Sequence, residues 1–156
     1  MIWGKYWKER RFGIADMPEA TVWLDMCKRV ATRGTCPRLR VGCVIVKNDG
    51  NKFTASGNGS PHGTDSCDEV GCDLENSHCV RALHAEARAL ISSRFPLGGA
   101  VLYCTDFPCY ACAKLIVEAG IVQVCVENDY KYGKKSKELF SQVGIAWTIQ
   151  NPKYDL

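Results

Sequence analysis

One histidine, one glutamate and two cysteines have the types and spacing of a reactive metal site. His84 and Glu86 are two residues apart, and Cys109 and Cys112 follow in a Pro-Cys-x-x-Cys sequence. An imidazole and two thiolates suit Zn²⁺, and three protein ligands leave a fourth position open, as in catalytic zinc sites. Glu86 is not needed as a ligand and is therefore free to transfer protons. The pattern predicts a catalytic zinc site.

The combination of His-x-Glu with Pro-Cys-x-x-Cys is typical of zinc-dependent nucleobase deaminases. In that chemistry, water activated by zinc attacks C4 of cytosine, and the products are uracil and ammonia. Glu86 would take the proton of the water, protonate N3 and later protonate the leaving amine. The alternative is a closed, non-catalytic zinc-binding module in which Glu86 is a surface charge, but such a module has no need of this glutamate.

The two halves of the predicted zinc site must each lie at the start of a helix. Residues two apart on a regular helix point to different sides, so His84 and Glu86 share a site only at a helix start. We expect that helix to cover residues 84–93. Pro108 is expected to open the next helix and to place Cys109 and Cys112 in its first turn, where the helix dipole favours thiolates.

Strand and helix patterns alternate along the rest of the chain, which predicts a three-layer α/β domain with a mixed sheet. We expect residues 1–17 to be an N-terminal extension and residues 18–156 to be a single catalytic domain. Residues 57–79 are expected to form a long irregular loop, which in a compact domain is usually functional. The expected helices are 18–33, 84–93, 108–120 and 136–143, and the expected strands are 41–47, 52–56, 100–105, 121–126 and 145–149.

Composition excludes several classes of protein. The 156 residues suit one domain, and a net charge of +3 is too small to indicate nucleic-acid binding by itself. The chain has no run of 18 apolar residues and does not begin with a secretion signal, so we expect a cytoplasmic location without membrane contact. Residues 1–17 mix aromatic and basic side chains, which either bind nucleic acid or, as we expect, pack on the domain.

The chain has ten cysteines, which is many for a cytosolic protein of this length. A disulfide framework is the alternative to metal binding, but disulfides are typical of secreted domains. Four of the cysteines lie inside apolar runs and are expected to be core residues: Cys27, Cys43, Cys104 and Cys125. The other six are left for chemistry.

Several stretches resemble the deoxycytidylate (dCMP) deaminase family, especially its bacterial and phage members. The resemblance covers most of residues 20–150 and implies a cytidine-deaminase-like α/β/α fold with a mixed five-stranded sheet. It also implies conversion of dCMP to dUMP with release of ammonia, which supplies dUMP for dTTP synthesis. The stretches are Thr35 to Gly42, Asn58-Gly59-Ser60-Pro61, Cys67 to Cys72, His78 to Glu86, and Gly99 to Cys112.

The resemblance implies substrate contacts for three residues. Asn58 would contact the sugar, the amide of Ala85 would contact the base, and Tyr130 would lie near the substrate. The chain departs from the family at two places, since Ser56-Gly57 stands where Gly-Tyr is usual, and Phe107 stands where Ser is usual before Pro-Cys. These departures affect the shape of the pocket.

Relatives carry a second, structural zinc in the region that contains four further cysteines. Four thiolates would close a tetrahedral site and would explain how a long loop holds its shape. His78 is an alternative ligand for one position, and four unrelated free thiols are the alternative to any site. The four cysteines are Cys36, Cys67, Cys72 and Cys79.

A nucleotide substrate requires a cation for its phosphate. The candidates are Arg38, Arg40, Lys131 and Lys134, each of which is alternatively a solvated surface charge. A second deaminase hypothesis takes tRNA, single-stranded DNA or a modified deoxycytidylate as substrate. The resemblance further implies a homo-oligomer, often a hexamer, with dCTP as activator and dTTP as inhibitor.

Overall fold

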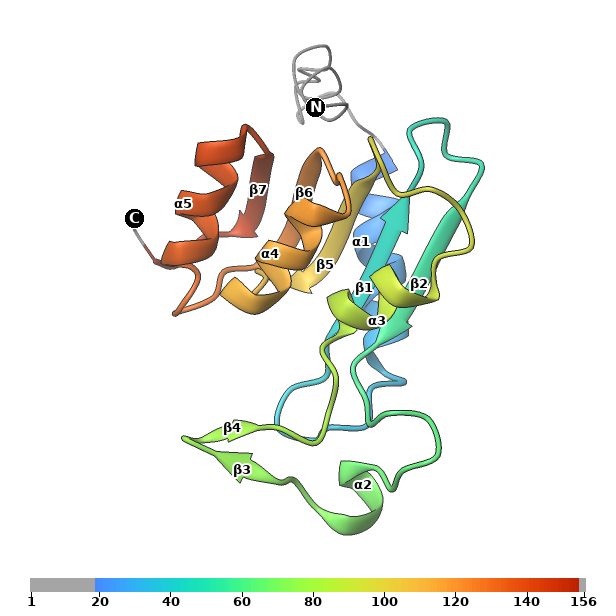
Figure 1. The fold of residues 1–156 in the computed structure, drawn as a ribbon, viewed down its shortest axis with the longest axis vertical. Coiled ribbons are helices and arrows are strands. Elements are labelled where there is room, and N and C mark those ends of the chain that lie inside the picture. The colour runs from blue at the N-terminus through green and yellow to red at the C-terminus, as the bar shows by residue number, and fades with distance from the viewer. Residues whose placement is uncertain (1–18, 155–156) are drawn as a thin grey trace.

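The computed structural model describes residues 19–154, so the predicted N-terminal extension (residues 1–17) lies outside the described residues. A mixed five-stranded sheet in the order β2-β1-β5-β6-β7 forms the centre (Figure 1). Strand β1 is antiparallel to β2 and β5, whereas β5, β6 and β7 are parallel. The strands are β1 Gly42–Val46, β2 Phe53–Gly57, β5 Val101–Asp106, β6 Gln123–Asn128 and β7 Ala146–Asn151.

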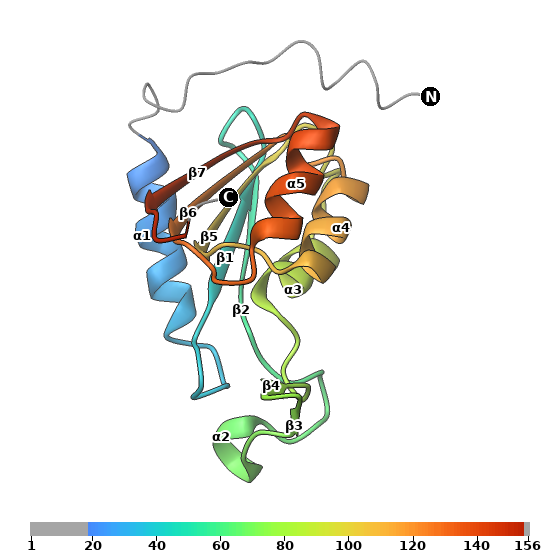
Figure 2. The same ribbon diagram turned by 90° about the vertical axis from the view of Figure 1, so that its left-hand side faces the viewer.

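Helices cover both faces of this sheet, which confirms the predicted three-layer fold (Figure 2). Helix α1 (Glu19–Ala31) lies on one face, where Leu24 and Cys27 pack with Val44 and Tyr103. Helices α3 (Ala85–Ser92), α4 (Tyr110–Glu118) and α5 (Lys134–Val143) lie on the other face. Alternate strand residues point to opposite faces, and a strand covered on both sides is apolar throughout, as β1 is. Among the described residues, no helix has the length and hydrophobicity needed to span a bilayer.

Several element boundaries differ from the predicted ones for local reasons. Helix α1 ends at Ala31, before the expected residue 33, because the amides of residues 32–34 bond to carbonyls three residues back and form a tighter turn. Strand β6 begins at Gln123 although the apolar run begins at Ile121. The Ile121 amide donates to the carbonyl of Ile116 and so belongs to the turn after α4. Helix α5 begins at Lys134, two residues before the prediction.

The expected irregular loop 57–79 contains regular structure. It holds the short helix α2 (Cys67–Val70) and a two-stranded hairpin of β3 (Leu74–Glu75) and β4 (His78–Cys79). Asn76 and Ser77 form the hairpin turn with positive φ angles of 48° and 66°, the conformation of a two-residue type I′ turn. We call residues 60–82 the cysteine lobe; it projects from the end of the sheet (Figure 1).

A buried ion pair anchors the segment between β6 and α5. The carboxylate of Asp129 lies 3.1 Å from Lys137 Nζ, and the two side chains are only 0% and 6% exposed. The carboxylate also accepts hydrogen bonds from the amides of Tyr130, Lys153 and Tyr154. Burial alone would raise the pKa of Asp129, but the Tyr154 amide, Lys137 and the other donors hold it below its usual value. Asp129 therefore fixes the loop that carries Tyr130.

We expect Asp129→Ala to lower the free energy of unfolding by about 3–5 kcal/mol, because it leaves the buried Lys137 ammonium without its counter-ion. The matched control is Asp25→Ala. The Asp25 side chain pairs with Lys28 but is 61% exposed, so this ion pair should contribute less than about 1 kcal/mol to the free energy of unfolding. The Asp129 contribution is present above the unfolded-state pKa of about 3.9 and is lost as the pH falls through the lower folded-state pKa. Urea denaturation at pH 7 and pH 3 measures both effects. Equal losses in the two variants at pH 7 would contradict this role.

Candidate active site and metal centres

Two helix starts meet at the predicted zinc site. His84 is the N-cap residue of α3, with φ −66° and ψ 148°, and Cys109 is the N-cap residue of α4, with φ −66° and ψ 165°. Cys112 lies in the first turn of α4. The prediction that Pro108 opens this helix is wrong by two residues, because α4 begins at Tyr110. The extended cap conformation turns His84 and Cys109 toward each other, as the sequence spacing required.

The distances among these three side chains fit a zinc ion. His84 Nδ1 lies 3.4 Å from Cys109 Sγ and 3.5 Å from Cys112 Sγ. Zn–N and Zn–S bonds of about 2.0 and 2.3 Å in a tetrahedron place nitrogen and sulfur roughly 3.5 Å apart. The three ligand atoms therefore have the separations that Zn²⁺ requires, and no fourth His, Cys, Asp or Glu among residues 19–154 joins the group.

The thiols and the imidazole already have the charge pattern of a metal site. A hydrogen bond from the Cys112 thiol, together with His84, lowers the pKa of Cys109 to about 4. The same sharing of a proton raises the pKa of Cys112. The Cys109 thiolate in turn raises the pKa of His84 to about 9. A thiolate at a helix N-terminus is a good zinc ligand, because the metal replaces the shared protons.

Glu86 lies in the first turn of α3 and is only 4% exposed. Burial raises its pKa to about 7. A carboxyl group with a pKa near the operating pH both accepts and donates protons efficiently. Glu86 lines the same cavity as His84 and Cys109, so it is placed to exchange protons with a molecule bound there.

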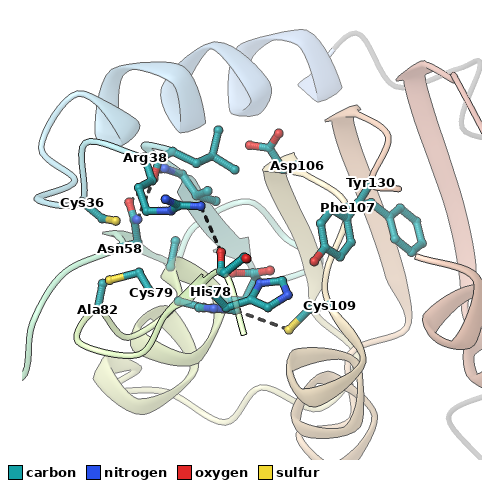
Figure 3. A pocket seen from close by; sticks show the side chains of 16 residues that line it. Cys36, Arg38, Asn58, His78, Cys79, Ala82, Asp106, Phe107, Cys109 and Tyr130 are labelled. Atoms are coloured by element: carbon teal, nitrogen blue, oxygen red, sulfur yellow. Dashed lines mark hydrogen bonds between the residues drawn. The ribbon is translucent and has the colours of Figure 1, made fainter. Parts of the chain in front are cut away.

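A cavity of about 590 Å³ opens beside this group (Figure 3). Asn58, Ala85 and Tyr130 all line it, as the family resemblance implied. Ala85 is buried in the first turn of α3, where backbone amides have no partner within the helix. The Tyr130 hydroxyl points into the cavity beside Phe107 (Figure 3), and burial raises the pKa of this hydroxyl.

Asn58 fixes the chain segment that enters β1. Its side-chain oxygen accepts a hydrogen bond from the amide of Val41 at 2.9 Å, and its side-chain nitrogen donates to the carbonyl of Leu39 at 2.8 Å. One amide hydrogen of Asn58 is left for a ligand, since a primary amide has two. Asn58 thus shapes the cavity wall in addition to facing it.

The four candidate phosphate cations have different environments. Arg38 lines the cavity, and its guanidinium donates to the Ser77 carbonyl at 2.9 Å. Arg40 does not line it, because its guanidinium is bound to Asp68 and to the carbonyl of Gly34. Lys131 lies over the ring of Tyr132, and Lys134 lies 4.0 Å from Glu138. The structure therefore distinguishes Arg38 from the other three candidates.

The cysteines of the loop region form a second group of metal-ligating side chains. Cys36 Sγ lies 3.7 Å from Cys72 Sγ, and Cys67 Sγ lies 3.5 Å from Cys79 Sγ. Four sulfurs around a zinc ion lie roughly 3.8 Å apart, so this separation fits a closed tetrahedral site. His78, the alternative ligand, is not in the group, and its ring contacts Tyr132 instead.

Two cavity residues were not identified from the sequence. Asp106 ends β5 with a partly buried carboxyl group that accepts a hydrogen bond from Thr105 Oγ1 at 2.7 Å, and burial raises its pKa. Its position three residues before Cys109 is the one feature that pointed to it. Ser77 contributes a backbone carbonyl, which no side-chain pattern reveals. The four cysteines expected in the core, by contrast, are all buried: Cys27, Cys43, Cys104 and Cys125.

The comparisons with known proteins agree with this geometry. The family model for the "Cytidine and deoxycytidylate deaminase zinc-binding region" matches residues 17–128. ComE operon protein 2 of Bacillus subtilis (strain 168) is 41% identical over 130 residues, which cover 81% of this chain and 67% of that protein. The deoxycytidylate deaminase of Schizosaccharomyces pombe is 35% identical over 134 residues, and the chain spans only 41% of its length.

A solved structure shares the fold as well. The dCMP deaminase of the cyanophage S-TIM5, in complex with dCMP and dUMP, has a TM-score of 0.73 and 28% identity, covering 85% of this chain and 98% of that one. The matched family region contains both helix starts that carry the three zinc-ligating side chains and Glu86. The chain therefore belongs to the cytidine and deoxycytidylate deaminase family.

Proposed function

We propose that this chain deaminates dCMP hydrolytically to dUMP and ammonia. The observation that carries the proposal is the buried carboxyl of Glu86 beside three zinc-ligating atoms at one cavity. The relatives named deoxycytidylate deaminase support the choice of substrate. The yeast relative is more than twice as long as the matching part of this chain, but the phage enzyme is matched over nearly its whole length.

His84, Cys109 and Cys112 would hold the zinc ion, which supplies Lewis-acid activation of water. Glu86 then performs the proton transfers of the reaction. It takes a proton from the attacking water, gives it to N3 of the ring, and later carries a proton to the leaving amine. The C4–N bond breaks, a C4=O bond forms, and one water is consumed for each ammonia released. A pKa of Glu86 near 7 suits both the base and the acid step.

The cavity residues have distinct parts in binding. The amide of Ala85 faces the base, the remaining amide hydrogen of Asn58 faces the sugar, and Tyr130 closes the side of the cavity next to Phe107. Arg38 provides the positive charge for the 5′-phosphate, because it is the one of the four candidate cations that lines the cavity. The roles of Asn58, Ala85 and Tyr130 are those that the family resemblance implies, and the position of each residue at the cavity wall supports them.

We further propose a second, structural zinc ion held by Cys36, Cys67, Cys72 and Cys79. The sulfur separations and the presence of two of these residues at the cavity wall support this site. The homo-oligomer, the regulation by dCTP and dTTP and the cytoplasmic location stay predictions, as does the supply of dUMP for dTTP synthesis.

Glu86→Gln should lower kcat for dCMP by about 10²–10⁴-fold, because the amide cannot transfer protons. The zinc content should stay unchanged, since Glu86 is not a ligand. Glu118→Gln, an exposed glutamate at the end of α4, is the matched control and should keep the wild-type rate. Steady-state assays with dCMP, dCTP, deoxycytidine and a cytosine-containing oligonucleotide test the activity and the alternative substrates together. A Glu86→Gln enzyme with a third of the wild-type rate would refute the proton-transfer role.

The purified protein should contain two zinc ions per chain, counted by elemental analysis. Cys112→Ala should lose activity and one zinc while keeping most of its thermal stability. Cys67→Ala should instead lower the melting temperature, because a structural zinc contributes directly to folding. Cys27→Ala, which alters a buried core thiol, should keep both ions. Fully active protein with one zinc per chain would disprove the second site.

Arg38→Ala should lower kcat/KM for dCMP by on the order of 10–100-fold, because a charge-assisted bond contributes about 1.5–3 kcal/mol. Its effect on deoxycytidine, which has no phosphate, should be within twofold. Lys134→Ala removes a cation outside the cavity and should leave both substrates unaffected. The ratio of kcat/KM for the two substrates is the measurement. An unchanged ratio in Arg38→Ala would show that Arg38 does not bind the phosphate.

A further inference from the structure

We propose that metal binding in the cysteine lobe fixes the phosphate-binding end of the active-site cavity, so that nucleotide recognition depends on the second metal site. This inference rests on the proposed function and on the assignment of Arg38 to the phosphate. It gives the four-cysteine group a role in substrate choice in addition to stability.

Two chain segments line the phosphate-binding end of the cavity. In each segment, a metal-ligating cysteine lies two residues from a residue of the phosphate-binding end. Cys36 precedes Arg38 by two residues, and Cys79 follows Ser77 by two residues. All four of these residues line the cavity. The segments are more than 30 residues apart in the chain, so a metal ion bound by Cys36 and Cys79 would hold them together at a defined distance.

The second connection between the segments is the hydrogen bond from Arg38 to the Ser77 carbonyl, at 2.9 Å (Figure 3). Arg38 is otherwise an exposed, long side chain with many rotamers. Immobilising such a side chain costs about 0.5–1.5 kcal/mol on binding, unless the protein has already ordered it. The Ser77 carbonyl therefore pre-orders the guanidinium at the cavity wall and leaves its other N–H groups for a phosphate.

The hairpin that presents this carbonyl has little stability of its own. Strands β3 and β4 have two residues each, and Leu74 is 49% exposed. An isolated two-stranded hairpin is marginal in water even when longer. The turn residues Asn76 and Ser77 also hold positive φ angles, which non-glycine residues adopt at a cost. The four cysteines are thus the main constraint on the position of the Ser77 carbonyl.

His78 extends the connection to the opposite wall. Its ring contacts Tyr132, with 6.2 Å between ring centroids, and Tyr132 contacts Tyr130 at 5.6 Å. His78 and Tyr130 both line the cavity, so the lobe reaches the loop after β6 across the cavity mouth. The Asp129 carboxylate, which accepts a hydrogen bond from the Tyr130 amide, holds that loop independently of the lobe. Loss of metal from the lobe would therefore displace the phosphate end and leave the Tyr130 side in place. The zinc-ligating residues on α3 and α4 belong to other elements and would keep their positions.

The test uses Cys72→Ser, because Cys72 belongs to the four-cysteine group but does not line the cavity. We expect one zinc per chain and a fall in kcat/KM for dCMP of on the order of 10–100-fold, expressed mainly in KM. Deoxycytidine turnover should change less than twofold. The affinity for dUMP, measured by calorimetry, should fall by the same factor as kcat/KM for dCMP. Combining Cys72→Ser with Arg38→Ala should cause no further loss, because both remove one interaction.

Two controls separate this role from general damage. Cys72→His retains four ligands, since Cys₃His sites also bind zinc, and should restore the preference for the nucleotide. Leu74→Ala truncates the exposed side chain opposite Cys79 in the hairpin, keeps all four cysteines, and should leave the preference unchanged. If Cys72→Ser does not fold, a chelator titration of the wild-type protein replaces it. Release of the zinc bound by the four cysteines should weaken dUMP binding while deoxycytidine turnover persists, whereas release of the active-site zinc should abolish turnover of both substrates.

Equal losses for dCMP and deoxycytidine, or a lower melting temperature with an unchanged substrate ratio, would overturn the inference. Failure of the proposed function would look different, because the wild-type protein would then not deaminate dCMP at all.

Discussion

The site depends on one constraint: the N-termini of α3 and α4 must meet within the span of a single metal ion. His84 caps one helix and Cys109 caps the other, and their ligand atoms are 3.4 Å apart. Helix α3 packs on β1 and β2, whereas α4 follows β5, the neighbour of β1 in the sheet. The sheet order therefore brings the two helix starts together. Their dipoles favour the anionic thiolates that a zinc ion needs.

The same constraint explains the burial of Glu86. Glu86 lies in the first turn of α3, is buried, and lines the cavity together with His84 and Cys109. Burial in this position raises the pKa of the carboxyl group toward neutrality, with no dedicated partner needed. Packing of the helix thus produces the acid–base group, and the open side of the cavity is left to residues that bind the substrate.

The sequence was sufficient to predict the three layers, the zinc-ligating residues of the active site and Glu86, because each rests on a local rule. His84 and Glu86 required a helix start, and the structure has one there. The contrast between Arg38 and Arg40 was not predictable. Arg38 lies in a turn before β1, where the alternation of strand side chains does not apply. Which of the two arginines reaches the cavity depends on tertiary partners, the Ser77 carbonyl for Arg38 and Asp68 for Arg40. The grouping of the four cysteines was predicted only through the family resemblance, because it depends on where the cysteine lobe, which projects from the end of the sheet, meets the segment of Cys36.

The central claim is that the chain uses this site to replace the amino group of dCMP with an oxygen atom from water. Incubation of the purified full-length protein with dCMP in H₂¹⁸O, followed by mass spectrometry of the nucleotide, tests it directly. We expect dUMP with one ¹⁸O atom at C4, one ammonia for each dUMP, and product formation that is about 10²–10⁴-fold slower in the Glu86→Gln variant. Absence of dUMP from the zinc-loaded wild-type protein, or dUMP without the label, would contradict it.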